Sequence, residues 1–129
     1  ANVHNISNAV CSSSVGTAHD LNAKAIVAPS ITGFTTRMLS KWRPKALIAG
    51  LSPSMTAVRQ MQLYWGVKPF HAKRAESTDA LLFASVELLK EKGIVKEGQI
   101  VVATAGVVTR ANRHEPVADT NIMRVIVVE

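Results

Sequence analysis

Short apolar runs alternate with helical patterns along almost the whole of this chain, and no other feature constrains its fold as strongly. The runs that we expect to be strands lie at residues 25–28, 46–51, 67–71, 100–104 and 121–128. The helical patterns lie at residues 5–21, 34–41, 52–66 and 77–92. Strands that alternate with helices form a mostly parallel sheet that helices cover on both faces. A chain of 129 residues has the length of one domain, so we predict a single α/β domain over residues 1–129, a three-layer α-β-α sandwich.

The connection between the last two expected strands differs from the others. Residues 109–119 are polar and show no helical pattern, and the loop is too short for the crossover that parallel neighbours need. We therefore expect the fifth strand to run antiparallel at an edge of the five-stranded sheet. From Ile122 to Val128 this strand is apolar on both faces. An edge of that kind favours pairing with a second copy, so we also expect a homo-oligomer, a dimer through this strand.

Local signals predict where one of the helices begins and which side of another is buried. Ser52 stands where it can cap the third helix, and Pro53 at the first helical position lacks an N–H that would have no partner there. In the first helix a loose apolar stripe is expected to face the sheet. It consists of Ile6, Val10, Val15, Ala18 and Leu21.

Composition narrows the class of protein. No apolar run approaches the roughly 18–20 residues that span a bilayer, and no signal-peptide pattern opens the chain, so we expect no membrane partner. The single cysteine, Cys11, cannot form an internal disulfide, which favours a reducing, cytoplasmic location; we expect it to be a buried, unreactive thiol. The net charge of +6 allows a nucleic-acid surface, but aromatic residues are only 5% and do not interleave with the basic ones. We therefore expect no nucleic-acid partner.

The residues that catalysis or metal binding would need are scattered. The four histidines have no metal-ligand spacing with one another or with Cys11. The three aspartates, Asp20, Asp79 and Asp119, lie far apart, and none follows an apolar strand. No nucleophile stands near a base in any recognisable pattern. We expect no catalytic residue and no metal site in this chain.

One segment, from Lys24 to Pro44, points to a ligand. An apolar strand runs into a turn rich in hydroxyl groups, and a helix with basic residues follows at once. The free N–H groups and the positive dipole end of such a helix favour a phosphate. The alternative is a plain Ser/Thr turn that only caps the helix. We predict a phosphate-binding turn, formed by Ser30, Ile31, Thr32, Gly33, Phe34, Thr35 and Thr36.

Two other segments are expected at the same edge of the sheet. The carboxyl ends of parallel strands meet at one edge, and there residues 69–74 and 109–119 join the turn. Arg110 and Arg113 in the second segment are candidates for holding a further phosphate by bidentate hydrogen bonds. They are equally consistent with solvated loop charges.

Seven short motifs connect the chain with a known family. In order, they are Asp20–Pro29, Ser30–Gly33, Thr36–Pro44, Tyr64–Pro69, Gly98–Val102, Ala105–Gly106 and Thr120–Val125. With this order and spacing, the chain resembles the C-terminal domain of pyruvate kinase over essentially its whole length. The resemblance implies a domain that binds an allosteric effector and contributes to assembly. It also implies that Ser30, Thr32, Gly33 and Thr35 grip a phosphate of a sugar phosphate, a sugar bisphosphate or a nucleoside monophosphate.

The resemblance places catalysis elsewhere. In the family, a separate barrel domain holds magnesium and potassium and transfers the phosphoryl group of phosphoenolpyruvate to ADP, so no cofactor is expected in this chain. Three hypotheses follow: a regulatory domain of pyruvate kinase, a domain that only mediates assembly, and a stand-alone, non-catalytic sensor of phosphorylated metabolites. The chain begins with Ala1, so we expect a processed protein or a piece of a longer one.

Overall fold

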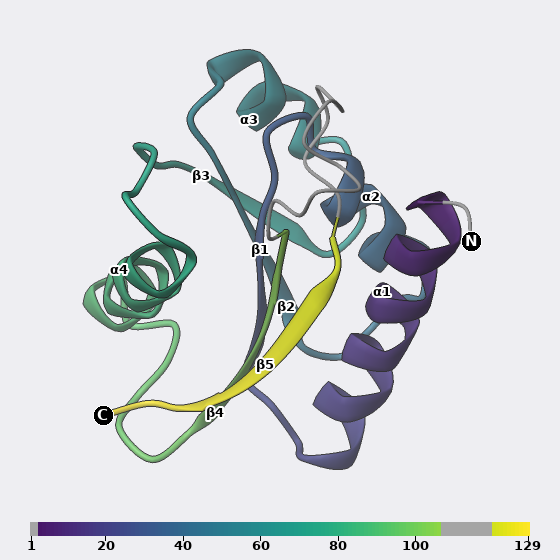
Figure 1. Ribbon diagram of the computed structural model, residues 1–129. Coiled ribbons are helices and arrows are strands. Elements are labelled where there is room, and N and C mark those ends of the chain that lie inside the picture. The colour runs from purple at the N-terminus through teal and green to yellow at the C-terminus, as the bar shows by residue number, and fades with distance from the viewer. Residues whose placement is uncertain (1–2, 107–119) are drawn as a thin grey trace.

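The computed structural model describes residues 3–106 and 120–129 (Figure 1). Its helices are α1 (Val3–Asp20), α2 (Phe34–Lys41), α3 (Met55–Met61) and α4 (Thr78–Glu91). Its strands are β1 (Ala25–Pro29), β2 (Leu47–Ser52), β3 (Val67–His71), β4 (Ile100–Ala105) and β5 (Ile122–Val127). Both sets lie close to the segments predicted from the sequence. None of the helices in the described residues is long and apolar enough to cross a membrane.

The strands form one sheet in the order β3-β2-β1-β4-β5. The pairs β1–β2, β1–β4 and β2–β3 are parallel. The pair β4–β5 is antiparallel, and β5 lies at an edge. The predicted α/β sandwich with an antiparallel fifth strand is therefore confirmed.

Helices cover both faces of this sheet, as Figure 1 shows: α1 and α2 lie on one side and α4 on the other. Successive side chains of a strand point to opposite faces, so the central strand β1 contributes to two separate cores. Ala25 and Val27 pack with the α4 side, whereas Ile26 and Ala28 pack with the side of α1 and α2. All four residues are fully buried, which explains why β1 appears in the sequence as a continuous apolar run.

The buried side of α1 matches the predicted apolar stripe only in part: Ala18 is buried, and Val15 packs against the same core. Ile6 and Leu21 are 42% and 41% exposed, whereas Ser7, Cys11 and Ser14 are at most 1% exposed. Small side chains let the helix approach the sheet closely, and the larger ones are displaced to its flank. Burial also raises the pKa of the Cys11 thiol to about 11. Because the thiolate is the reactive form, this agrees with the unreactive thiol expected from the sequence.

The start of α3 also differs from the sequence prediction. Ser54, not Ser52, caps the helix, and its hydroxyl accepts a hydrogen bond from the N–H of Ala57. Ser52 is the last residue of β2. Its hydroxyl accepts from the N–H of Ser54 and donates to the carbonyl of Ile31. The Ser-Pro pair predicted a helix start two residues too early because Ser52 holds another segment in place.

A close approach in β2 gives a first testable expectation. A Cβ atom added at Gly50 would lie 2.6 Å from Sδ of Met61 and 2.8 Å from Cγ2 of Thr36, and both of those side chains are fully buried. We expect Gly50→Ala to lower the free energy of unfolding by about 1–3 kcal/mol, measured by urea denaturation. Gly16 in α1 is the matched control, because an added Cβ meets nothing within 4 Å. Gly16→Ala should raise stability by about 1 kcal/mol, and an unchanged Gly50→Ala would contradict the close packing.

Candidate functional site

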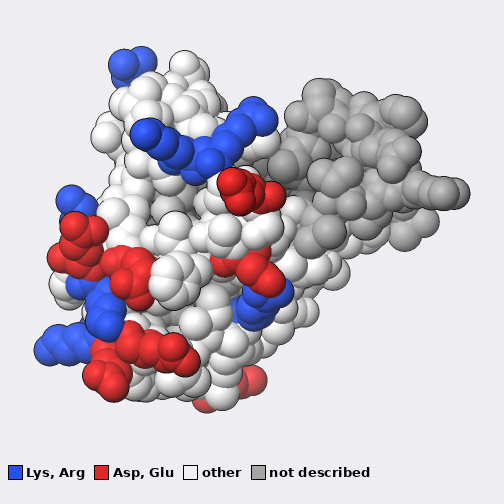
Figure 2. Space-filling view, turned by 60° about the vertical axis from the view of Figure 1, so that its left-hand side comes forward, with Lys and Arg blue, Asp and Glu red and all other residues white. Residues whose placement is uncertain are grey.

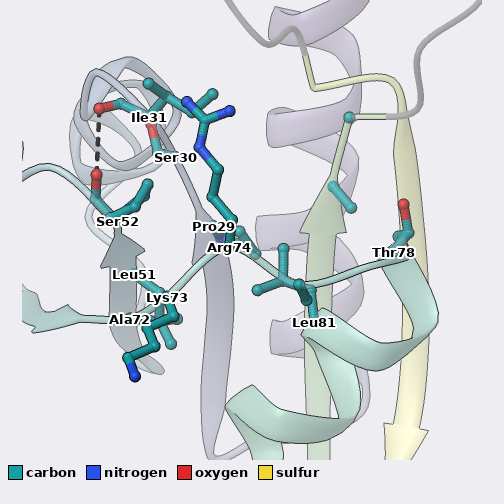
Figure 3. A pocket seen from close by; sticks show the side chains of 14 residues that line it. Pro29, Ser30, Ile31, Leu51, Ser52, Ala72, Lys73, Arg74, Thr78 and Leu81 are labelled. Carbon is teal, nitrogen blue, oxygen red and sulfur yellow. Dashed lines mark hydrogen bonds between the residues drawn. The ribbon is translucent and has the colours of Figure 1, made fainter.

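The order of the strands creates a switch point between β1 and β4. The chain moves outward from β1 to β2 and β3, and then returns past β1 to form β4. The connections that follow the neighbouring strands β1 and β4 therefore run in opposite directions. This separation opens a crevice at the carboxyl ends of the two strands, and ligands of open α/β sheets bind in such a crevice. A cavity of about 220 Å³ lies there (Figure 3). Its lining comes from the ends of three strands, from residues 72–75 and from the start of α4.

The turn after β1 is shaped by hydrogen bonds to its own backbone. Gly33 precedes α2 with φ of 85°, a left-handed conformation that suits glycine. The hydroxyl of Ser30 accepts from the N–H of Gly33 at 2.9 Å, and the hydroxyl of Thr32 accepts from the N–H of Phe34 at 3.3 Å. Neither hydroxyl donates its own proton to another described residue. Both protons are therefore available to an anion.

The other two hydroxyls of the turn hold the fold together. Thr36, fully buried, donates to the carbonyl of Gly33 at 2.7 Å. The hydroxyls of Thr35 and Thr120 lie 2.6 Å apart, and both residues are buried. The backbone N–H groups of Thr35 and Thr36 make no hydrogen bond to any described residue outside α2. Any contact of these two residues with an anion would come from the backbone, at the positive end of the helix.

Three hydrogen bonds join this turn, the end of β2 and the segment that follows β3 to one another. The N–H of Ser30 donates to the carbonyl of Leu51 at 2.8 Å. The hydroxyl of Ser52 donates to the carbonyl of Ile31 at 3.2 Å, and the N–H of Ala72 donates to the carbonyl of Ser52 at 3.0 Å. Ser52 thus bridges the turn and the segment that follows β3.

That segment brings two basic residues to the cavity, Lys73 and Arg74. In Figure 3 the guanidinium of Arg74 points toward the turn and lies beside Ile31, whereas the amino group of Lys73 points away from it. The sequence placed residues 69–74 at this edge but did not assign Arg74 to the site. The signal was present, since a Lys-Arg pair stands two residues after the end of β3.

The predicted site residues are only partly brought together. Ser30 and Ile31 line the cavity; Thr32, Gly33, Phe34, Thr35 and Thr36 belong to the same turn but not to the lining. Arg110 and Arg113 lie outside the described residues, so their role as a second contact stays a prediction. Ser52 and Thr78 line the cavity and were not predicted as site residues.

The charges around the cavity are unevenly distributed. Figure 2 shows a row of basic side chains across the upper part of the face that carries α4, whereas acidic and basic side chains are mixed below it. The 14-residue helix α4 begins at the cavity with Ser77 as its cap, so its positive dipole end adds to the charge of Arg74. Asp79 in its first turn forms an ion pair with Arg124 of β5. Within residues 3–106 and 120–129, no three His, Cys, Asp or Glu residues form a group that could hold a metal ion.

Comparisons with known proteins give one consistent family. The model of the pyruvate kinase alpha/beta domain matches residues 8–126. The chain is 40% identical over 112 residues to a pyruvate kinase of Clostridium acetobutylicum, covering 87% of this chain and 23% of the relative. It is 41% identical over 118 residues to a pyruvate kinase of Staphylococcus aureus strain USA300, covering 92% and 19%. The chain thus spans about a fifth of the length of these relatives.

Solved structures agree with this fold. A crystal structure of a pyruvate kinase from Cryptosporidium parvum superimposes with a TM-score of 0.83 at 26% identity. The match covers 96% of this chain and 23% of that protein. Another Cryptosporidium parvum pyruvate kinase structure gives a TM-score of 0.79 at 25% identity, covering 96% of this chain and 22% of that protein.

The buried pair of Thr35 and Thr120 gives a second expectation. Thr35→Val leaves the hydroxyl of Thr120 without its partner, which should lower the free energy of unfolding by about 1–3 kcal/mol. The double variant Thr35→Val/Thr120→Val removes both polar groups and should recover part of that loss. Urea denaturation of the two single variants and the double variant gives the coupling energy. Simple additivity of the two substitutions would contradict a direct hydrogen bond.

Proposed function

This chain belongs to the pyruvate kinase alpha/beta domain family, and we propose from that premise that it is a regulatory domain that binds a phosphorylated effector. The observation that carries the proposal is the cavity at the switch point, where the hydroxyl-rich turn and Arg74 face one another. The effector would be a sugar phosphate, a sugar bisphosphate or a nucleoside monophosphate. Its phosphate would lie on the turn from Ser30 to Thr36.

Three kinds of donor converge on that phosphate. The hydroxyls of Ser30 and Thr32 offer protons that no described residue accepts. The N–H groups at the start of α2 supply further donors together with the helix dipole. The guanidinium of Arg74 matches phosphate geometry with two parallel N–H donors. A cleft with basic residues and several neutral donors suits an anion better than an uncharged ligand.

Regulation would act by linkage. An effector that binds one quaternary state better than another shifts their populations by no more than its difference in affinity. Catalysis, the transfer of a phosphoryl group from phosphoenolpyruvate to ADP, would lie outside this chain together with its magnesium and potassium. We therefore assign no catalytic residue here, and a cytoplasmic location fits the single buried cysteine.

Titration calorimetry tests the phosphate site. We expect Arg74→Gln to weaken binding of a phosphorylated effector about tenfold or more, because a hydrogen bond to a charged group contributes about 1.5–3 kcal/mol. Gly33→Asp places a carboxylate in the turn and should abolish binding. The control is Lys73→Gln. It removes the same charge from the neighbouring residue, whose side chain points away from the turn, and should leave binding unchanged.

The ligands for this titration are fructose 1,6-bisphosphate, glucose 6-phosphate and AMP. Binding that Gly33→Asp and Arg74→Gln leave intact would move the site elsewhere. Absence of heat with all three ligands would favour a domain that only mediates assembly. A chain that binds an effector without any pyruvate kinase partner would instead favour a stand-alone sensor.

A second candidate function, assembly, is favoured by the surface of β5. Met123, Val125 and Val127 alternate along one side of this strand and are 37%, 44% and 59% exposed. The other side carries Ile122 and Ile126, which pack against the core on the α4 side. No other strand among residues 3–106 and 120–129 pairs with the outer edge of β5, and its one apolar side is partly exposed. We propose that two copies pair through β5 in a homodimer.

Sedimentation velocity tests this assembly. We expect the unmodified chain to sediment as a dimer and Val125→Lys to sediment as a monomer, because a charge would be buried at the interface. Phe83→Lys is the matched control, since Phe83 is 68% exposed on α4 and should leave the dimer intact. A monomeric wild-type chain at micromolar concentration, or a dimeric Val125→Lys variant, would contradict pairing through β5.

A further inference from the structure

We propose that a groove at the amino ends of the strands is a docking site for an extended, acidic segment of a partner protein. Figure 1 shows this edge of the sheet at the lower end of the molecule, where α1 turns into β1. The cavity of the effector site lies at the carboxyl ends of the strands. The two sites are independent of one another, because they occupy opposite edges of the sheet.

Two adjoining cavities form this groove. One, of about 470 Å³, lies between the C-terminal half of α1 and the connection from α2 to β2. The other, of about 610 Å³, lies at the starts of β1, β2 and β4. The cavities share Asn22, Ala23, Lys45 and Ala46, so the groove is continuous from α1 to β4. A groove of this length suits an extended chain better than a compact small molecule.

The groove carries positive charges that are not paired with any described residue. Lys24, Arg43 and Lys45 belong to its lining, and the described lining contains no aspartate or glutamate. None of these three side chains forms an ion pair within residues 3–106 and 120–129. Asp20 and Glu97 adjoin the lining in the sequence and are exposed, but neither is part of it. Carboxylates of a partner would therefore find complementary charge here.

The ends of the two helices do not require these basic side chains. The last turns of α1 and α2 already accept hydrogen bonds from the backbone N–H groups that follow each helix. By contrast, the N–H groups of Lys45 and Ala46 donate to no described residue. These two neutral donors lie beside the cations, and a carboxylate accepts from both kinds of donor.

Arg43 has a backbone conformation that glycine adopts more easily. Its φ of 50° lies in the left-handed region, where a side chain costs free energy. The guanidinium lies 4.8 Å from the ring centre of Trp65, which holds the cation in place. Residues in such conformations are frequent at binding sites. Docking accounts for an arginine at a position where glycine would be less strained.

Exposed apolar side chains supply the other half of the recognition. Trp42 and Leu21 line the groove, and they are 48% and 41% exposed. Successive side chains of an extended segment point in opposite directions. Apolar residues of the partner can thus pack on the groove while the acidic residues between them reach the cations. The chemistry that fits is a segment in which acidic and apolar residues alternate.

Fluorescence anisotropy on the complete 129-residue chain tests this docking. The probe is a short fluorescein-labelled peptide in which glutamate alternates with leucine, and the control peptide has glutamine in place of glutamate. We expect the glutamate peptide to bind about tenfold more tightly and to lose affinity as salt is raised from about 0.05 M to about 0.5 M. Equal affinities, or no measurable binding of the glutamate peptide, would overturn the proposal.

Charge reversal shows whether the peptide occupies the groove. Lys45→Glu should weaken binding of the glutamate peptide about tenfold. The matched control is Arg59→Glu, which makes the same change of charge at an exposed position of α3 and should leave the affinity unchanged. Arg43→Gly should weaken binding without lowering the midpoint of urea denaturation, whereas a purely structural arginine would give the reverse result. Full affinity in Lys45→Glu, or equal losses in Lys45→Glu and Arg59→Glu, would exclude the groove.

Tryptophan fluorescence locates the peptide independently. The chain has two tryptophans, so in Trp65→Phe all of the tryptophan emission comes from Trp42. We expect saturating peptide to shift this emission to shorter wavelength, because leucine side chains would cover the exposed indole. Binding by anisotropy without such a shift would place the peptide elsewhere. Displacement by free glutamate at the same affinity would indicate a small-anion site, and self-association that Lys45→Glu abolishes would indicate a second copy; either result overturns the proposal.

Discussion

The complete burial of Ala25 to Ala28 in β1, between two parallel neighbours, is the constraint on which the rest of this molecule depends. Its side chains supply both cores, with Val27 on one side and Ile26 on the other. The strand ends at Pro29, and the next N–H group, that of Ser30, still finds a partner in the carbonyl of Leu51. Because β4 returns to the other side of β1, the strand ends at the switch point. The position of the cavity is therefore a consequence of how the core is filled.

Ser52 shows how such a site is assembled from segments far apart in the sequence. Its hydroxyl donates to Ile31 and accepts from Ser54, and its carbonyl accepts from Ala72. One small residue thus fixes the turn after β1, the start of α3 and the segment that leads to Arg74. A polar side chain at the end of a buried strand can do this because three strand ends meet within hydrogen-bond distance.

The sequence predicted the fold well because its strongest signals are local and agree with one another. Continuous apolar runs mark strands that are buried on both faces, and the loop without a helix correctly predicted an antiparallel β5. Signals that depend on tertiary contacts were less reliable. The apolar stripe of α1 was wrong at Ile6 and Leu21, because the close contact with the sheet is made by smaller residues such as Ser7 and Cys11. Ser52 was taken for a cap because its partner, the carbonyl of Ile31, is 21 residues away. Arg74 was not assigned to the site, although the sequence placed its segment at the same edge, because the direction of its side chain depends on the fold.

The proposed effector site and the proposed assembly strand are physically connected at two places. Thr35, in the first turn of α2, bonds to Thr120 just before β5, and Asp79, in the first turn of α4, pairs with Arg124 in β5. The ion pair is exposed on both sides, and exposed pairs contribute less than about 1 kcal/mol. A coupling of typical size, about 1–3 kcal/mol, therefore cannot come from that pair alone. The buried hydroxyl pair is the stronger link, because breaking it leaves a polar group without a partner away from water. A ligand that shifts the N–H group of Thr35 therefore also acts on the hydroxyl pair that joins Thr35 to Thr120, just before β5.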